Sequence, residues 1–129
     1  FTVANDVTAD GDWGADDMIR VKGSDTFCPL GPWMVTHFSV AEAGNVRLRT
    51  TVDGTVCQES STSEMIRSVS ELVSEISSRL TLLPGDVILT GTPAGAATVV
   101  PRQQVEVEIE GIGTLVNSVV AGQNAVVEG

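Results

Sequence analysis

Aspartates gathered near the start of the chain raise the question of metal binding. Besides Asp6, the polar run between residues 10 and 17 contains Asp10, Asp12, Asp16 and Asp17. Carboxylate oxygens are the ligands that hard divalent cations prefer. A calcium loop that began at Asp10 would need glycine at its sixth position and glutamate at its twelfth, where the chain has Ala15 and Val21. The spacing therefore favours a solvated acidic loop over a calcium site.

Asp6 differs from these aspartates because it follows a strand-like stretch. Residues 1–4 read Phe-Thr-Val-Ala, and this alternation places Asp6 at the end of an ordered element. Rigid placement suits a catalytic metal ligand, but a single carboxylate binds a divalent ion poorly. From the residues alone, a structural or capping role for Asp6 is favoured, and a role as ligand stays open.

Three further groups could bind an anion or transfer a proton. The single histidine, His37, follows an apolar run and is expected to be a structural imidazole rather than a catalytic base. Lys22 precedes Gly23 and could bind a substrate carboxylate or face solvent. Residues 91–95 could offer backbone N–H groups and the Thr92 hydroxyl to an anion, or form a plain turn after a strand. They lack the Gly-Lys-Ser/Thr of a phosphate loop.

A hairpin and a helix are the clearest elements that would position these groups. Asp53-Gly54 tolerates the positive φ angles of a tight turn, so residues 46–57 are expected to form a β-hairpin. Apolar residues recur at helical spacing between Met65 and Leu80, which predicts one main helix over residues 61–80. Ser61 and Glu64 fit a capping box at its start.

The remaining elements are expected to be strands. A turn at residues 84–86 leads into a short apolar strand at residues 87–90. Residues 105–110 alternate strictly, so the valines and the isoleucine should face a core while the glutamates face water. A turn at residues 111–113 then leads into a strand over residues 114–120. The sequence therefore predicts a β-rich body with one packed helix and no βαβ rhythm.

Composition limits the classes of partner and the compartment. The chain has 129 residues, enough for a single domain, and 17 acidic against 7 basic residues give a net charge of −10. With no basic cluster, nucleic acid and anionic membrane surfaces are not expected partners. Cys28 and Cys57 are expected to be reduced, partly buried thiols. Without a leader or an apolar run of membrane-spanning length, we expect a cytoplasmic protein.

Four segments, taken in order, closely resemble the C-terminal part of the catalytic domain of the fumarylacetoacetate hydrolase family. They read VANDVTA, KGSDTFCPLGPWMVT, PGDVILTGTPAG and VEVEIEGIGTLVNSV, and together they cover nearly the whole chain. The resemblance implies an α+β, β-rich fold built around a rolled mixed β-sheet. It also implies that residues 1–129 are one domain, the C-terminal part of a larger catalytic domain. A homodimer, or association with an upstream chain segment, is expected.

The resemblance also implies a metal and roles for individual residues. Family members hold one Mg²⁺ or Mn²⁺ through a Glu-x-Glu pair and an aspartate that matches Asp6. The family lysine before the Gly-x-Asp-Thr segment matches Lys22, which would balance negative charge on a carboxylate or enolate. The family threonine of the Thr-Gly-Thr-Pro segment matches Thr92, whose hydroxyl, with the backbone at Gly91, would orient the substrate carboxylate. Catalytic roles are thereby implied for Lys22 and Thr92.

The substrates implied by the resemblance are 2-oxo or 1,3-dioxo carboxylates, such as acylpyruvates, fumarylpyruvate, oxaloacetate and ring-cleavage dienoates. A hard cation chelated by such an acid polarises its carbonyl and stabilises the enolate that forms when a C–C bond breaks. Hydrolysis, decarboxylation and isomerisation share this enolate. They differ in the acid or base that a mobile lid supplies.

The chain departs from the family pattern at several places. The family's Glu-x-Glu pair and its lid histidine and glutamate would lie upstream of Phe1, and the alternating glutamates between Glu106 and Glu110 are a solvent face. Asp10-Gly11 replaces a family Arg-Asp, and Ala96-Ala97 replaces a Val-Gly. The leading interpretation is the C-terminal part of a metal-dependent 2-oxo acid enzyme. A non-catalytic subunit or pseudoenzyme, and a metal-independent carboxylate-binding module, are the alternatives.

Overall fold

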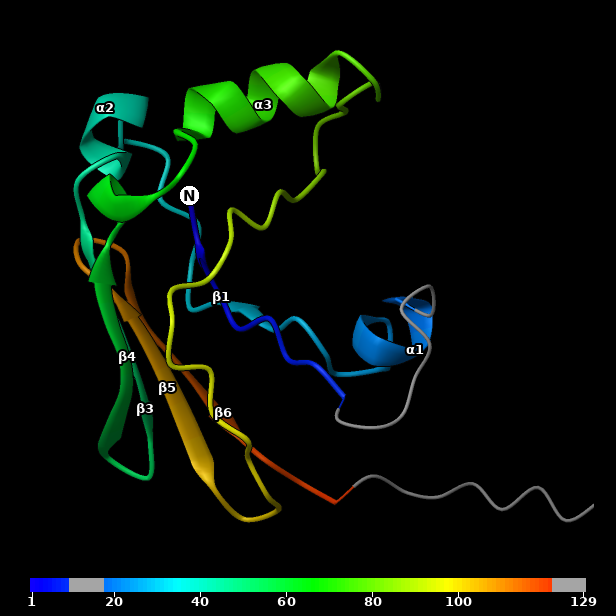
Figure 1. The fold of residues 1–129 in the computed structure, drawn as a ribbon, viewed down its shortest axis with the longest axis vertical. Coiled ribbons are helices and arrows are strands. Elements are labelled where there is room, and N and C mark those ends of the chain that lie inside the picture. The colour runs from blue at the N-terminus through cyan, green and yellow to red at the C-terminus, as the bar shows by residue number, and fades with distance from the viewer. Residues whose placement is uncertain (10–17, 122–129) are drawn as a thin grey trace, which may run out of the picture.

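The computed structural model describes residues 1–9 and 18–121 of the chain (Figure 1). Within these ranges the elements follow in the order β1 (Val3–Ala4), α1 (Met18–Lys22), β2 (Leu30–Gly31), α2 (Val40–Ala43), β3 (Arg47–Val52), β4 (Thr55–Ser61), the 3₁₀ turn η1 (Thr62–Glu64), α3 (Val69–Ser77), β5 (Gln104–Ile109) and β6 (Gly113–Ser118). No helix in the described ranges is long and apolar enough to cross a bilayer. Strands form the body, and the helices lie around it.

A four-stranded antiparallel sheet, in the order β4-β3-β5-β6, forms this body. The short β1 and β2 pair with each other, also antiparallel, and β1 packs across β5 and β6. The β-rich α+β class is therefore confirmed. All pairings among the described residues are antiparallel, and the sheet is open rather than rolled into a closed body. The parallel pairing of a mixed sheet is not present in this part of the chain.

The core lies on one face of the four-stranded sheet. Val3 is fully buried and packs in one cluster with the buried Val35, Val105, Val107, Ile112 and Leu115. The alternation predicted for residues 105–110 is confirmed, because Val105 and Val107 are buried while Glu108 and Glu110 are exposed. On the outer face Arg49 contacts Glu108 and Arg47 contacts Glu110. The glutamates that alternate along β5 are therefore a solvated face and not a metal-binding pair.

The predicted hairpin at residues 46–57 is confirmed and extends further than its sequence signal. Asp53 and Gly54 have φ angles of 48° and 78°, the left-handed conformation that a tight turn between β3 and β4 requires. The Asp53 carboxylate also accepts hydrogen bonds from the backbone N–H of Gln104 and from Nε2 of Gln103. The turn residue therefore links the hairpin to the start of β5.

The prediction of one helix over residues 61–80 is wrong at both ends. β4 keeps pairing with β3 as far as Ser61, which lies opposite Arg47, so this backbone is already hydrogen-bonded in the sheet. Ser61 instead caps η1, where its side chain accepts from the Ser63 N–H and does not form the predicted box with Glu64, and α3 begins only after a capping box made by Ser68 and Glu71. The helix ends at Ser77. Sheet pairing therefore occupies the predicted start of the helix at Ser61, and the backbone at Met65, just after η1, is extended rather than helical.

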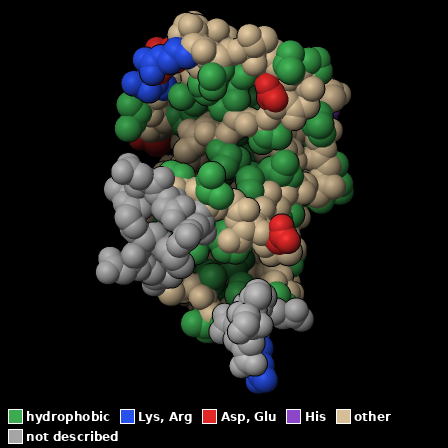
Figure 2. Space-filling view, turned by 90° about the vertical axis from the view of Figure 1, so that its right-hand side faces the viewer, with side chains coloured by type: hydrophobic (Ala, Val, Ile, Leu, Met, Phe, Trp, Pro, Cys, Tyr) green, Lys and Arg blue, Asp and Glu red, His purple; other side chains and the backbone are tan. Residues whose placement is uncertain are grey.

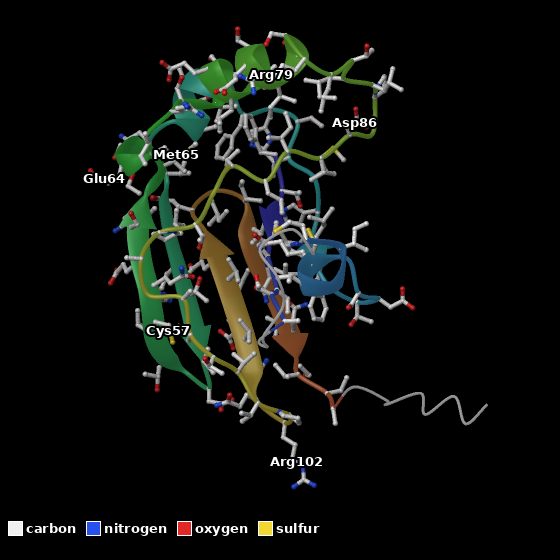
Figure 3. The ribbon with its side chains drawn as sticks, turned by 45° about the vertical axis from the view of Figure 1, so that its right-hand side comes forward. Cys57, Glu64, Met65, Arg79, Asp86 and Arg102 are labelled. Atoms are coloured by element: carbon white, nitrogen blue, oxygen red, sulfur yellow. The ribbon has the colours of Figure 1, made fainter. Side chains whose placement is uncertain are left out.

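The strand predicted for residues 87–90 is not formed in the described chain. The turn before it is present, since the Asp86 N–H donates to the Leu83 carbonyl at 3.0 Å. After this turn the chain descends along the sheet beside β4, from Asp86 near α3 toward Cys57 (Figure 3). A strand exists only where a neighbouring backbone pairs with it, and no described strand pairs with residues 87–99. Much of the face seen in Figure 2 carries exposed hydrophobic side chains.

Candidate functional site

Asp6 and Lys22 form an ion pair just beyond the end of β1. Lys22, the last residue of α1, donates from Nζ to Asp6 Oδ2 at 2.6 Å and to Thr8 Oγ1 at 2.9 Å. A backbone hydrogen bond from the Ala9 N–H to the Val21 carbonyl, 2.8 Å long, ties the two segments together. About a third of each charged side chain is exposed, 38% for Asp6 and 34% for Lys22. The carboxylate and the ammonium are thus placed together and remain open to a ligand.

The described residues supply one carboxylate toward a metal ion rather than a full set. Among residues 1–9 and 18–121, no three histidine, cysteine, aspartate or glutamate side chains gather closely enough to hold a metal. Asp6 is held by its ion pair with Lys22 and is chemically suited to be one ligand of Mg²⁺ or Mn²⁺. The acidic loop at residues 10–17 lies outside the described residues, so the prediction that it is solvated stays a prediction. These residues alone do not make a metal centre.

Thr92 lies in a loop that is fixed against β4. Gln58 donates from Nε2 to Thr92 Oγ1 at 2.9 Å and to the Pro93 carbonyl at 2.8 Å. Only 9% of the Gln58 residue is exposed. At Gly95, with φ of 98°, a Cβ atom would overlap the Cys57 carbonyl oxygen, so only glycine lets the loop approach the strand this closely. Gly91 is also in the left-handed region, with φ of 110°.

The Asp6–Lys22 pair and Thr92 belong to the same face of the sheet. Gln58 stands opposite Thr50, Thr50 opposite Val107, and Val107 opposite Leu115, so these four side chains share the core face. Val3 packs on this row at the β5 and β6 end. Asn5 also donates to Asn117 of β6, at 3.3 Å. Asp6 therefore lies toward the β6 edge, while Thr92 lies beside β4.

No hydrogen bond or ion pair among the described residues joins these two groups. None of the hydrogen bonds or ion pairs between described side chains joins Thr92 to Asp6 or Lys22. The predicted site residues are thus brought to one face in two places, Asp6 with Lys22 and Gly91 with Thr92. Gln58 was not predicted, although a glutamine at a core-facing position of a strand is an unusual choice that could have drawn attention to it.

The remaining candidates take other roles. His37 was expected to be a structural imidazole, but its side chain is exposed and its ring lies tilted against Phe38, with centroids 5.6 Å apart. The interior of the small body is filled by aliphatic side chains, which leaves His37 on the surface. Cys28 and Cys57 are half-buried free thiols. None of these three residues adjoins the Asp6–Lys22 pair through a hydrogen bond within the described part of the chain.

Comparisons with known proteins identify relatives of stated activity. The chain is 45% identical to the 4-hydroxyphenylacetate degradation bifunctional isomerase/decarboxylase of Salmonella dublin, over 83% of this chain and 25% of that protein. It superposes on the 2-hydroxyhepta-2,4-diene-1,7-dioate isomerase from Mycobacterium marinum with a TM-score of 0.80 at 47% identity, covering 92% of this chain and 46% of that one.

A hydrolase structure is also similar. The maleylpyruvate hydrolase from Sphingobium sp. SYK-6, in complex with manganese (II) ion and pyruvate, gives a TM-score of 0.73 at 33% identity, over 77% of this chain and 38% of that one. The chain thus spans less than half the length of each of these proteins. Residues 1–120 match the family model for the fumarylacetoacetate (FAA) hydrolase C-terminal region. The chain belongs to the fumarylacetoacetate hydrolase family.

Proposed function

We propose that this chain supplies part of the active site of an enzyme that processes small 2-oxo carboxylates with Mg²⁺ or Mn²⁺. The observation that carries the proposal is the Asp6–Lys22 pair, 2.6 Å apart and partly exposed. The relatives support the reaction class, because their names state isomerase, decarboxylase and hydrolase activities. We infer that the reaction is the cleavage, decarboxylation or isomerisation of a 2-oxo or 1,3-dioxo carboxylate.

Asp6 would bind the metal cation, and Lys22 would bind an anionic group of the substrate. Asp6 would be one ligand of the cation, which when bound polarises the carbonyl of the substrate. Lys22 neutralises Asp6 in the structure, and its compact ammonium can equally pair with a substrate carboxylate or with negative charge that develops during the reaction. The remaining ligands of the cation would come from outside the described residues.

Thr92 and Gly91 would hold a carboxylate of the substrate. A carboxylate only accepts hydrogen bonds, so it needs donors such as the Thr92 hydroxyl and backbone N–H groups. The loop carries these donors on the face of the sheet that also carries Asp6. We also propose that the active assembly contains a second copy of the chain or a segment with the missing cation ligands.

Oxalate, which mimics an enolpyruvate, tests this proposal. Calorimetric titration of the active assembly with oxalate, in the presence and absence of Mg²⁺, should show binding that depends on the cation, and Asp6→Asn should remove that dependence. Asp53→Asn is the matched control, since it removes the same charge and keeps a turn that Asn-Gly also favours. Equal oxalate affinity with and without Mg²⁺ would overturn the metal-dependent function and support a carboxylate-binding module.

A further inference from the structure

We propose that Gln58 is a positioning residue that fixes the Thr92 hydroxyl as a hydrogen-bond donor to a carboxylate ligand. This inference rests on the proposed function, and it adds a residue that none of the four family-like segments contains. Gln58 lies at the centre of β4 and is 9% exposed. Its partners Thr92 and Pro93 lie 34 and 35 residues further along the chain.

The Pro93 carbonyl determines which way round the Gln58 amide lies. A carbonyl oxygen only accepts, so the group that faces it at 2.8 Å must be the amide nitrogen and not the amide oxygen. The same nitrogen is 2.9 Å from Thr92 Oγ1. Its two hydrogens are thus directed to two acceptors, and the amide orientation follows from the contacts themselves.

This orientation determines what the Thr92 hydroxyl can do. Because Oγ1 accepts from Gln58, its own hydrogen is not used in that contact and remains available to another acceptor. A hydroxyl that accepts one hydrogen bond becomes a better donor in the next. Thr92 is exposed, so this donor is accessible to a ligand that only accepts, such as a carboxylate.

An isosteric substitution should reverse this hydroxyl. In Gln58→Glu, an ionised carboxylate would be repelled by the Pro93 carbonyl, since both only accept, and Thr92 would have to donate its hydrogen to Glu rather than to the ligand. A ligand carboxylate would then lose its donor, while a carboxamide N–H could donate to the Thr92 oxygen. Oxalate and oxamate, which differ by one carboxylate replaced by a carboxamide, distinguish the two states.

The experiment measures the affinity of oxalate and of oxamate, with Mg²⁺, for the unsubstituted chain and for its variants, each within the assembly that supplies the missing cation ligands. Gln58→Glu should weaken oxalate about tenfold or more, as expected for one lost hydrogen bond to a charged group, and should weaken oxamate less. Thr92→Val should weaken oxalate to a similar extent, and adding Gln58→Glu to it should cost little more. Thr92→Ser, which keeps the hydroxyl that Thr92→Val removes, should bind oxalate nearly as tightly as the unsubstituted chain. Gln104→Glu, which adds the same charge on an exposed position of β5, should leave both affinities unchanged.

Two results would overturn the positioning role. One is an equal loss of oxalate and oxamate affinity in Gln58→Glu, which indicates a structural effect alone. The other is that Gln58→Glu lowers oxalate affinity as much in the Thr92→Val background as in the unsubstituted chain, which would show that Gln58 does not act through Thr92. If Gln58→Glu does not fold, Gln58→Met in the same cycle with Thr92→Val decides the question. Failure of the unsubstituted chain to bind oxalate within the assembly that supplies the missing cation ligands would reject the proposed function itself, together with this inference.

Discussion

The Asp6–Lys22 ion pair is better suited to binding than to holding the fold together. A third or more of each side chain is exposed, and ion pairs of this kind stabilise proteins by about 1 kcal/mol or less. Lys22→Met should therefore change the free energy of unfolding by less than about 1 kcal/mol, while oxalate binding falls at least several-fold. Urea unfolding and calorimetry measure the two effects. A large loss of stability with unchanged oxalate affinity would contradict this assignment.

Gly95 tests how tightly the Thr92 loop is held to β4. Gly95 and Gly85 have nearly equal φ angles, 98° and 101°, but an added Cβ would overlap the Cys57 carbonyl only at Gly95 and would meet open space at Gly85. Gly85→Ala should cost about 1–3 kcal/mol through its backbone conformation. Gly95→Ala should cost about 1–3 kcal/mol more through overpacking, measured by urea unfolding. Equal losses would mean that the loop can lift from the strand.

Some of these residues could be identified from the sequence because they lie within segments that resemble the family. Asp6, Lys22 and Thr92 were each named from the segment around them, and the structure shows that Asp6 and Lys22 meet. Gln58 could not be found this way, because its importance comes from contacts with Thr92 and Pro93 across more than thirty residues. Only the fold brings β4 and this loop together.

At the scale of elements, the capping box of α3 makes the helix sensitive to acid. The backbone N–H of Ser68, and then its hydroxyl, donate to Glu71 and lower the pKa of that carboxyl from its ordinary value of 4.5. A group with a lowered pKa stabilises the folded state above its ordinary value, and this contribution is lost as the pH falls through the folded pKa. Circular dichroism should show helicity falling below about pH 4.5, and less steeply in Glu71→Gln. An unchanged acid transition in Glu71→Gln would count against the box.

Backbone amides of residues 87–99 should be poorly protected from hydrogen exchange compared with those of the sheet. No described strand pairs with it, whereas the amides of β3 are bonded to β4 on one side and β5 on the other. Amides without such partners exchange rapidly with solvent. Hydrogen exchange followed by mass spectrometry should therefore label residues 87–99 well before β3. Slow exchange there would show that another chain or segment pairs with it.

Local signals were sufficient for some elements and not for others. The Asp53-Gly54 turn and the alternation along β5 determine their own geometry, so both were predicted correctly. The start of α3 and the state of residues 87–90 depend on which backbone groups already have partners in the sheet. An apolar run of four residues carries no information about whether a partner strand is present.

For the whole molecule, charge and exposed apolar surface act in opposite directions. The net charge of −10 makes copies of the chain repel each other. Large hydrophobic side chains are nevertheless exposed on the segment after α3, among them Leu80, Leu83 and Val87 at 65, 63 and 55%. Exposed apolar surface of this kind is typical of an interface. Whether copies associate should therefore depend on how strongly salt screens the repulsion.

Salt should promote self-association of the chain through this surface. Raising the ionic strength from about 0.01 M to 0.15 M shortens the Debye length from about 30 Å to 8 Å, which screens charge repulsion and leaves apolar attraction in place. Sedimentation velocity should show a shift toward larger species with salt, and Val87→Lys should reduce it. Val116→Lys is the matched control, because Val116 is similarly exposed, at 48%, but belongs to the outer face of the sheet opposite Glu106. Equal effects of the two substitutions would show that added charge alone, and not the loss of a specific apolar contact, controls association.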